Sequence, residues 1–179
     1  MSLAALTLAG CAALPDDAAV VEQLDDETGA TISRLGRPLE LYRETFVQDS
    51  TGRFAFFGPF ETNQMGAREL FLWLAVPIDS PADAEPPTIE VNGKPVTLGA
   101  PGRAADFAGL RTSPYKVPTP WSSMYYFKID AALLATLGDA HDLAIRVGES
   151  TKEGTIRTMF TTPVGADARL REFAARQQQ

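Results

Sequence analysis

Two residues of this chain stand out for their chemistry, because each is the only one of its kind. Cys11 is the only cysteine and His141 the only histidine among the 179 residues. A lone thiol cannot close a disulfide within the chain, but it can carry a lipid as a thioether. A lone imidazole would have to serve any Ser-His-Asp triad and any zinc site that uses histidine. His141 precedes Asp142 between a predicted helix and a predicted strand, which favours a turn residue over a catalytic one.

The residues before Cys11 give its thiol a specific role. A short apolar stretch ends in the sequence Leu8-Ala9-Gly10-Cys11. This sequence resembles the lipobox of bacterial lipoproteins, whose signal peptidase requires small residues before the cysteine that carries diacylglycerol. The resemblance implies a signal peptide, a lipid on Cys11 and, because Ala12 follows, the periplasmic face of the outer membrane. The alternative is a domain that is not lipidated and that buries Cys11.

The composition is that of a globular protein with an acidic surface. Apolar residues make up 45% of the chain and charged residues 22%, and this length is enough for one hydrophobic core. The net charge of −7 argues against a nucleic-acid partner, because binding to phosphates depends on clustered Lys and Arg. It also gives no attraction to anionic lipid headgroups, so a membrane location requires an anchor.

Familiar catalytic and cofactor-binding motifs are missing from the sequence. It contains no G-x-S-x-G, G-x-x-x-x-G-K-[ST], H-E-x-x-H or G-x-G-x-x-G. We therefore expect no cofactor and no metal, and we assign no catalytic residue. A hydrolase that uses two facing carboxylates stays open, because sequence does not exclude such a pair. The glutamates in or beside predicted strands, where charge is usually solvated, are Glu40, Glu44, Glu61, Glu69 and Glu90.

The chain is expected to divide into three parts. Residues 1–11 form the signal-peptide remnant and lipobox, residues 12–29 an acidic tether, and residues 30–179 a single domain. The tether has no basic residue, which is typical of a solvated spacer. Its carboxylates lack the alternating spacing of a calcium-binding loop; they are Asp16, Asp17, Glu22, Asp25, Asp26 and Glu27.

After residue 29, short runs rich in β-branched and aromatic residues alternate with Gly, Pro, Asn and Asp, as in a sandwich. With the lipobox and the acidic spacer, this pattern resembles the many uncharacterised bacterial lipoproteins that carry an immunoglobulin-like domain. We expect a mainly β protein, an antiparallel immunoglobulin-like β-sandwich with one short connecting helix and a C-terminal helix. The predicted strands cover residues 30–34, 39–47, 53–60, 69–78, 88–91, 95–98, 122–129, 142–147 and 155–161.

Local patterns refine the predicted strands. Residues 70–76 are apolar without alternation, which indicates a central strand covered on both faces. Asn92-Gly93 lies between two apolar runs and predicts a hairpin turn with positive φ at both residues. Residues 63–66 lie between two of the most apolar strands, and Gly66 suits a turn there.

Two helices follow from capping and periodicity. Asp130 is the predicted N-cap of a helix that ends with Gly138 in the C′ position. Residues 167–176 place Leu170 and Phe173 on one helical face, so this helix either docks or protrudes.

The stretch from residue 99 to residue 121 has neither a strand nor a helix pattern and contains four prolines. Connections of this length are often functional. Its three basic residues outnumber its one acidic residue, whereas the whole chain is acidic, and aromatic residues are enriched at interfaces. The alternative is that its aromatic side chains cover the sandwich. The candidate binding residues are Arg103, Arg111, Tyr115, Lys116 and Trp121.

These observations favour a membrane-anchored, non-enzymatic binding or assembly module of the bacterial cell envelope, which recognises a protein or glycan through residues 99–121. The alternative function is a hydrolase of envelope glycan or lipid that uses an Asp/Glu pair. A third hypothesis is a structural domain without a lipid.

Overall fold

The computed structural model describes residues 20–43, 54–77, 85–116, 122–151, 154–161 and 168–177. Cys11 and Trp121 lie outside these ranges, as do Glu44 and the end of the strand predicted for residues 39–47.

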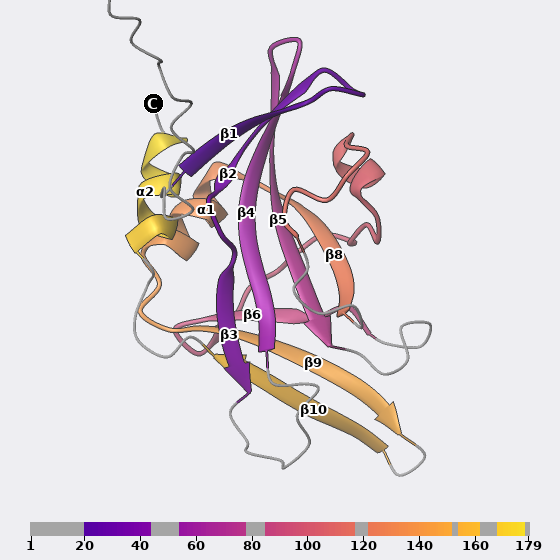
Figure 1. Ribbon diagram of the computed structural model, residues 1–179. Coiled ribbons are helices and arrows are strands. Elements are labelled where there is room, and N and C mark those ends of the chain that lie inside the picture. The colour runs from indigo at the N-terminus through magenta and orange to yellow at the C-terminus, as the bar shows by residue number, and fades with distance from the viewer. Residues whose placement is uncertain are drawn as a thin grey trace, which may run out of the picture.

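The strands form an antiparallel, sandwich-like arrangement of two groups. Strand β3 (Leu39–Arg43) pairs with both β4 and β10 and so joins the groups. Figure 1 shows β9 and β10 running across the direction of β4 and β5. The predicted mainly β, antiparallel sandwich is therefore confirmed. The first group is β1 (Val20–Asp25), β2 (Ala30–Leu35), β4 (Phe54–Gln64), β5 (Ala67–Pro77) and β8 (Ser122–Ile129); the second is β10 (Gly154–Thr161), β9 (Leu143–Thr151), β6 (Thr88–Val91) and β7 (Lys94–Pro95).

Strand β5 is the central strand that the sequence predicts. It pairs with β4 on one side and with β8 on the other, and residues 71–76 are buried. Strand β8 has the predicted bounds, and both Tyr125 and Tyr126 are fully buried. Both faces of β8 are therefore covered at these neighbouring residues.

The predicted helices are present, and they pack against each other. Helix α1 (Ala131–Gly138) begins at Asp130, whose carboxylate accepts a hydrogen bond from the backbone N–H of Leu133 at 2.7 Å. Helix α2 (Ala168–Arg176) buries Leu170 and Phe173 and docks against α1.

Gly138 does not have its predicted role. It is the last residue of α1 and lacks the positive φ of a C′ glycine. A Cβ at this position would lie 2.9 Å from the Cβ of Ala174. A residue without a side chain is therefore required at position 138, because α2 approaches α1 closely at this point.

The acidic tether predicted for residues 12–29 was wrong from residue 20 onward. Strand β1 pairs along its whole length with β2, from Val20 opposite Leu35 to Asp25 opposite Ala30. Pairing satisfies the backbone polar groups, while the edge position leaves Glu22 exposed to water. An acidic composition is thus compatible with a strand at the edge of a sheet.

Several predicted strand boundaries also changed; strand β9, for example, extends to Thr151, four residues beyond the prediction. The hairpin at Asn92-Gly93 has positive φ at both residues, as expected, but its second strand, β7, is only two residues long instead of the predicted 95–98. Strand β4 extends to Gln64, four residues beyond the prediction.

Candidate interaction surface

Residues 99–116, here called the strap, lead from β7 to β8 and cover one face of β4, β5 and β8. Two backbone hydrogen bonds join Gly102 to Tyr126 at 2.8 and 3.0 Å. A turn of 3₁₀ helix, η1 (Ala105–Ala108), follows. Leu110 is buried, and the ring of Phe107 lies 6.3 Å from that of Phe71. Residues 99–116 are therefore folded against the sheet. This arrangement agrees with the alternative in which the aromatic side chains of residues 99–121 cover the sandwich.

Tyr115 fixes the strap at a break in the sheet. Residues 36–38 separate β2 from β3, and Leu35, the last residue of β2, does not pair with β4. The opposite Gly58 and Pro59 of β4 have no strand partner on that side. The hydroxyl of Tyr115 donates a hydrogen bond to the carbonyl of Pro59 and accepts one, at 3.1 Å, from the N–H of Leu35. One side chain thus satisfies two backbone groups that the interrupted ladder leaves without partners.

The surroundings of Tyr115 are those of a core residue. It is 3% exposed, and its ring centroid lies 5.1 Å from that of Trp73. A Cβ at Gly58 would lie 2.5 Å from its ring, so glycine is needed for this approach. The guanidinium carbon of Arg34 lies 5.5 Å from the ring centroid. Burial raises the pKa of the Tyr115 hydroxyl, so it stays protonated and able to donate.

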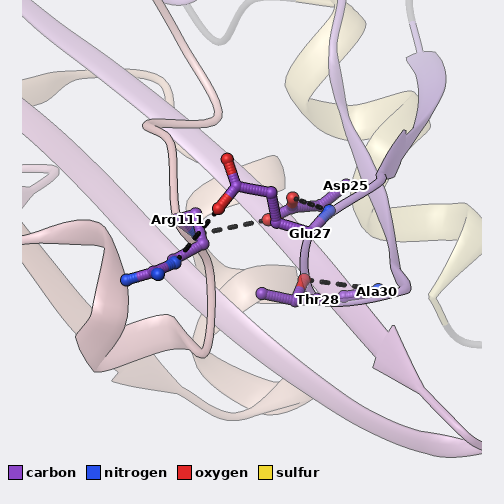
Figure 2. A network of polar contacts seen from close by, with 5 residues as sticks. All are labelled: Asp25, Glu27, Thr28, Ala30 and Arg111. Atoms are coloured by element: carbon purple, nitrogen blue, oxygen red, sulfur yellow. Dashed lines mark hydrogen bonds and ion pairs between the residues drawn. The ribbon is translucent and has the colours of Figure 1, made fainter.

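The middle of the strap is joined to the turn between β1 and β2, as Figure 2 shows. The carboxylate of Asp25, which is buried, accepts hydrogen bonds from the backbone N–H groups of Arg111 and Glu27, each at 3.2 Å. The Arg111 side chain pairs with Glu27 at 3.2 Å, and both side chains are exposed. The hydrogen bond from the Arg111 N–H is the main reason that the pKa of Asp25 is lowered. Asp25 and Glu27, which were expected in a solvated tether, therefore bind the strap through Arg111.

The outer side of the strap exposes cations and one aromatic ring. Phe107 is 43% exposed although it touches Phe71. The guanidinium of Arg103 lies 4.0 Å from the ring centroid of the buried Tyr125, a cation–π contact. Arg103 and Lys116 are both exposed. Asp106 is also exposed. The exposed residues Arg103, Phe107, Arg111 and Lys116 of the strap are here together called the outer strap surface.

The structure separates the five candidate residues into three classes. Arg103, Arg111 and Lys116 are exposed on the strap. Tyr115 is buried and belongs to the core, so its prediction as a surface residue was wrong. Trp121 lies outside the described residues. Phe107, one of the aromatic residues expected in the alternative to cover the sandwich, joins the exposed set because 43% of it remains exposed.

Three of the strand glutamates are paired with cations. Glu61 pairs with Arg68 at 2.9 Å, Glu90 with Arg146 at 2.8 Å, and Glu69 with Lys128. The hydrogen bond from Arg146 lowers the pKa of Glu90, which therefore stays ionised. A hydrolase that protonates its leaving group requires the reverse, a carboxyl with a raised pKa facing a second carboxylate. These three glutamates thus give the hydrolase alternative no support.

The remaining chemistry-bearing groups of the described chain have structural surroundings. His141 is exposed in the turn before β9, where its backbone N–H donates to the Asn92 side chain at 2.8 Å. Within the described ranges, no three His, Cys, Asp or Glu side chains lie close enough together to hold a metal ion. No helix in these ranges is long and apolar enough to cross a membrane.

Comparisons of the chain with protein-family models, with curated proteins and with solved structures gave no match.

Proposed function

We propose that this protein is a lipid-anchored, non-enzymatic binding or assembly module of the bacterial cell envelope, and that it recognises its partner through the outer strap surface. The observation that carries the proposal is that Phe107 remains 43% exposed on a strap whose two flanks are fixed, by Gly102 and by Tyr115. A fixed surface loses little conformational entropy on binding, which favours affinity.

The charge of the outer strap surface indicates the chemistry of the partner. Arg103 and Lys116 are exposed cations on a chain with a net charge of −7. A partner that offers acidic groups to these cations and an apolar contact to Phe107 is complementary to the exposed residues of the strap. An envelope protein or an acidic glycan has this chemistry, and a nucleic acid is disfavoured by the charge of the whole chain.

The anchor in this proposal is the lipid on Cys11. Metabolic labelling with a fatty acid should mark the protein when the full gene is expressed, and Cys11→Ser should release it from the membrane fraction. A membrane-bound Cys11→Ser protein, or a wild type without label, contradicts the anchor.

The recognition surface is tested by cross-linking in the native cells. A photoreactive residue at position 107 should give one discrete adduct, identified by mass spectrometry, and Arg103→Gln should weaken it several-fold. The same residue at position 94, on the exposed β7, is the control, and Lys94→Gln is the matched change of charge. If positions 107 and 94 give the same adducts, the outer strap surface is not the binding site.

A further inference from the structure

Two hairpin turns of this protein share one backbone conformation but differ in sequence. At the turn between β6 and β7, Asn92 and Gly93 have φ values of 51° and 72°. At the turn between β4 and β5, Met65 and Gly66 have φ values of 53° and 91°. Asn-Gly is the preferred sequence for such a turn, because both residues tolerate positive φ. Methionine does not share this tolerance, so Met65 is held in an unfavourable conformation.

A methionine at position 65 is unfavourable for a second, independent reason. Its apolar side chain is fully exposed to water. Strained residues are often found at functional sites, and an exposed large apolar side chain at the same position adds a further cost. Its neighbours Gln64, Gly66 and Ala67 carry no charge. The turn therefore presents an apolar side chain on an uncharged tip.

A second exposed apolar residue lies on the neighbouring tip. The β1–β2 turn is joined to the β4–β5 turn by a hydrogen bond of 3.3 Å from the Gln64 side chain to the Thr28 carbonyl. Leu24, at the end of β1 beside this turn, is 57% exposed. Figure 1 shows the β4–β5 turn projecting beyond the other strands, with the end of β1 at the same end of the molecule. Leu24 and Met65 are here called the apical pair.

The chain between Cys11 and Val20 is long enough for a lipid on Cys11 and the apical pair to contact the same membrane surface. Nine peptide bonds separate Cys11 from Val20, and an extended chain of this length spans up to roughly 30 Å. Strand β1 has six residues, so its start lies only about 20 Å from the tip. A membrane that holds the lipid is thus within reach of the tip.

The charge near the apical pair indicates which lipids suit it. The β1–β2 turn carries Asp26 and Glu27, which are exposed, and Arg111 pairs with Glu27, so Asp26 is the carboxylate of this turn that the pair does not neutralise. Anionic headgroups would repel the Asp26 carboxylate, whereas zwitterionic headgroups would not. The length of chain between Cys11 and Val20 favours a membrane over a protein partner at the tip.

We propose that the apical pair is a second membrane contact, in which Met65 and Leu24 enter the interface of a zwitterionic lipid surface and orient the anchored domain. This inference rests on the proposed function for the location of the protein at a membrane. Two such side chains bind too weakly to recruit a protein from solution, but they suffice to orient one that is already attached. The outer strap surface is then presented at a defined angle to its partner.

The test couples the full chain through Cys11, its only cysteine, to zwitterionic vesicles that contain a small fraction of maleimide-headgroup lipid. An anionic oxidant that does not enter the bilayer is added, and oxidation of Met65 is followed by mass spectrometry. Burial of a methionine side chain predicts that Met65 reacts about tenfold more slowly on vesicles than in solution. The half-buried Met124 and Met159 should react at the same rate in both.

Variants separate contact from folding. Leu24→Asp should return the oxidation rate of Met65 toward its value in solution, whereas Phe54→Asp, at the other end of β4, should leave the protection unchanged. Met65→Asn installs the preferred Asn-Gly turn, so it should fold at least as well as the wild type. Amide exchange of residues 63–68 should slow on vesicles in the wild type and stay unchanged in Met65→Asn.

Each outcome supports or overturns the membrane contact. Equal oxidation rates of Met65 on vesicles and in solution overturn it. Protection in intact envelopes but not on vesicles also overturns it, in favour of a protein partner. Weaker protection after half of the lipid is made anionic supports it. Because the attachment is chemical, a failure of native lipidation at Cys11 would refute the proposed anchor and leave this result unaffected.

Discussion

The two ends of the strap differ in what their side chains do. At one end, Tyr115 is buried and bonds to β2 and β4, where it replaces the missing strand pairing. Toward the other end, Arg103 and Phe107 rest on buried aromatic rings while part of each side chain remains in water. This difference shows that an aromatic residue in a long connection cannot be assigned a binding role from its residue type alone. Its hydrogen-bond partners and its burial decide between the two roles.

The largest expected effect comes from Tyr115. Tyr115→Ala removes a buried ring and should lower the free energy of unfolding by about 3–5 kcal/mol. Tyr115→Phe keeps the ring but leaves the Pro59 carbonyl and the Leu35 N–H without their partner, which should cost about 1–3 kcal/mol. Urea unfolding measures both. A Tyr115→Phe protein as stable as the wild type would contradict the role of the hydroxyl at the break.

Gly58→Ala tests the same end of the strap from the side of the sheet. The new Cβ would lie 2.5 Å from the Tyr115 ring, so the ring must move, at a cost of about 1–3 kcal/mol. The double variant Gly58→Ala with Tyr115→Ala should lose less than the sum of the two single changes, because the clash is gone. Strict additivity in urea unfolding would show that the two residues do not touch.

Asp25 tests the middle of the strap, and its effect depends on pH. The folded-state pKa of Asp25 is lowered, so its carboxylate stabilises the fold above the unfolded value of about 3.9, and this contribution is lost as the pH falls through the folded pKa. Asp25→Asn should therefore destabilise by about 1–2 kcal/mol near pH 7. The gap between variant and wild type should close below pH 4.

That dependence is measured by urea midpoints of both proteins between pH 7 and pH 3. Asp26→Asn is the matched control, because Asp26 is exposed in the same turn. A gap for Asp25→Asn that stays constant over this range would mean that the carboxylate charge does not hold the Arg111 N–H.

The smallest expected effect on stability belongs to the outer strap surface. Arg103→Gln should change the free energy of unfolding by no more than about 0.5–1 kcal/mol, which is the size of an exposed cation–π contact. Lys116→Gln should change it even less. Thermal unfolding measures both values, and the partner adduct at position 107 is measured on the same proteins. A large loss of stability for Arg103→Gln with the adduct intact would place Arg103 with Tyr115 among the structural residues.

The fold could largely be predicted from the sequence because its signals are local. The apolar run of β5, the Asn92-Gly93 turn and the Asp130 cap each depend on neighbouring residues, and each was confirmed. The acidic segment that became β1 could not be recognised in this way. Its carboxylates are compatible with a strand only because β1 is an edge strand and because Asp25 meets the Arg111 N–H, far away in the chain.

The candidate site was predictable only in part. Sequence by itself determined that residues 99–121 form an unusual connection, since proline, charge and length are properties of composition. Only the tertiary structure decided which of its side chains are structural. The three-residue interruption between β2 and β3 leaves the Pro59 carbonyl and the Leu35 N–H without ladder partners on β2 and β4. A buried polar group must find a partner wherever the chain can supply one. Tyr115 supplies it from 80 residues beyond Leu35, a pairing that no local pattern encodes.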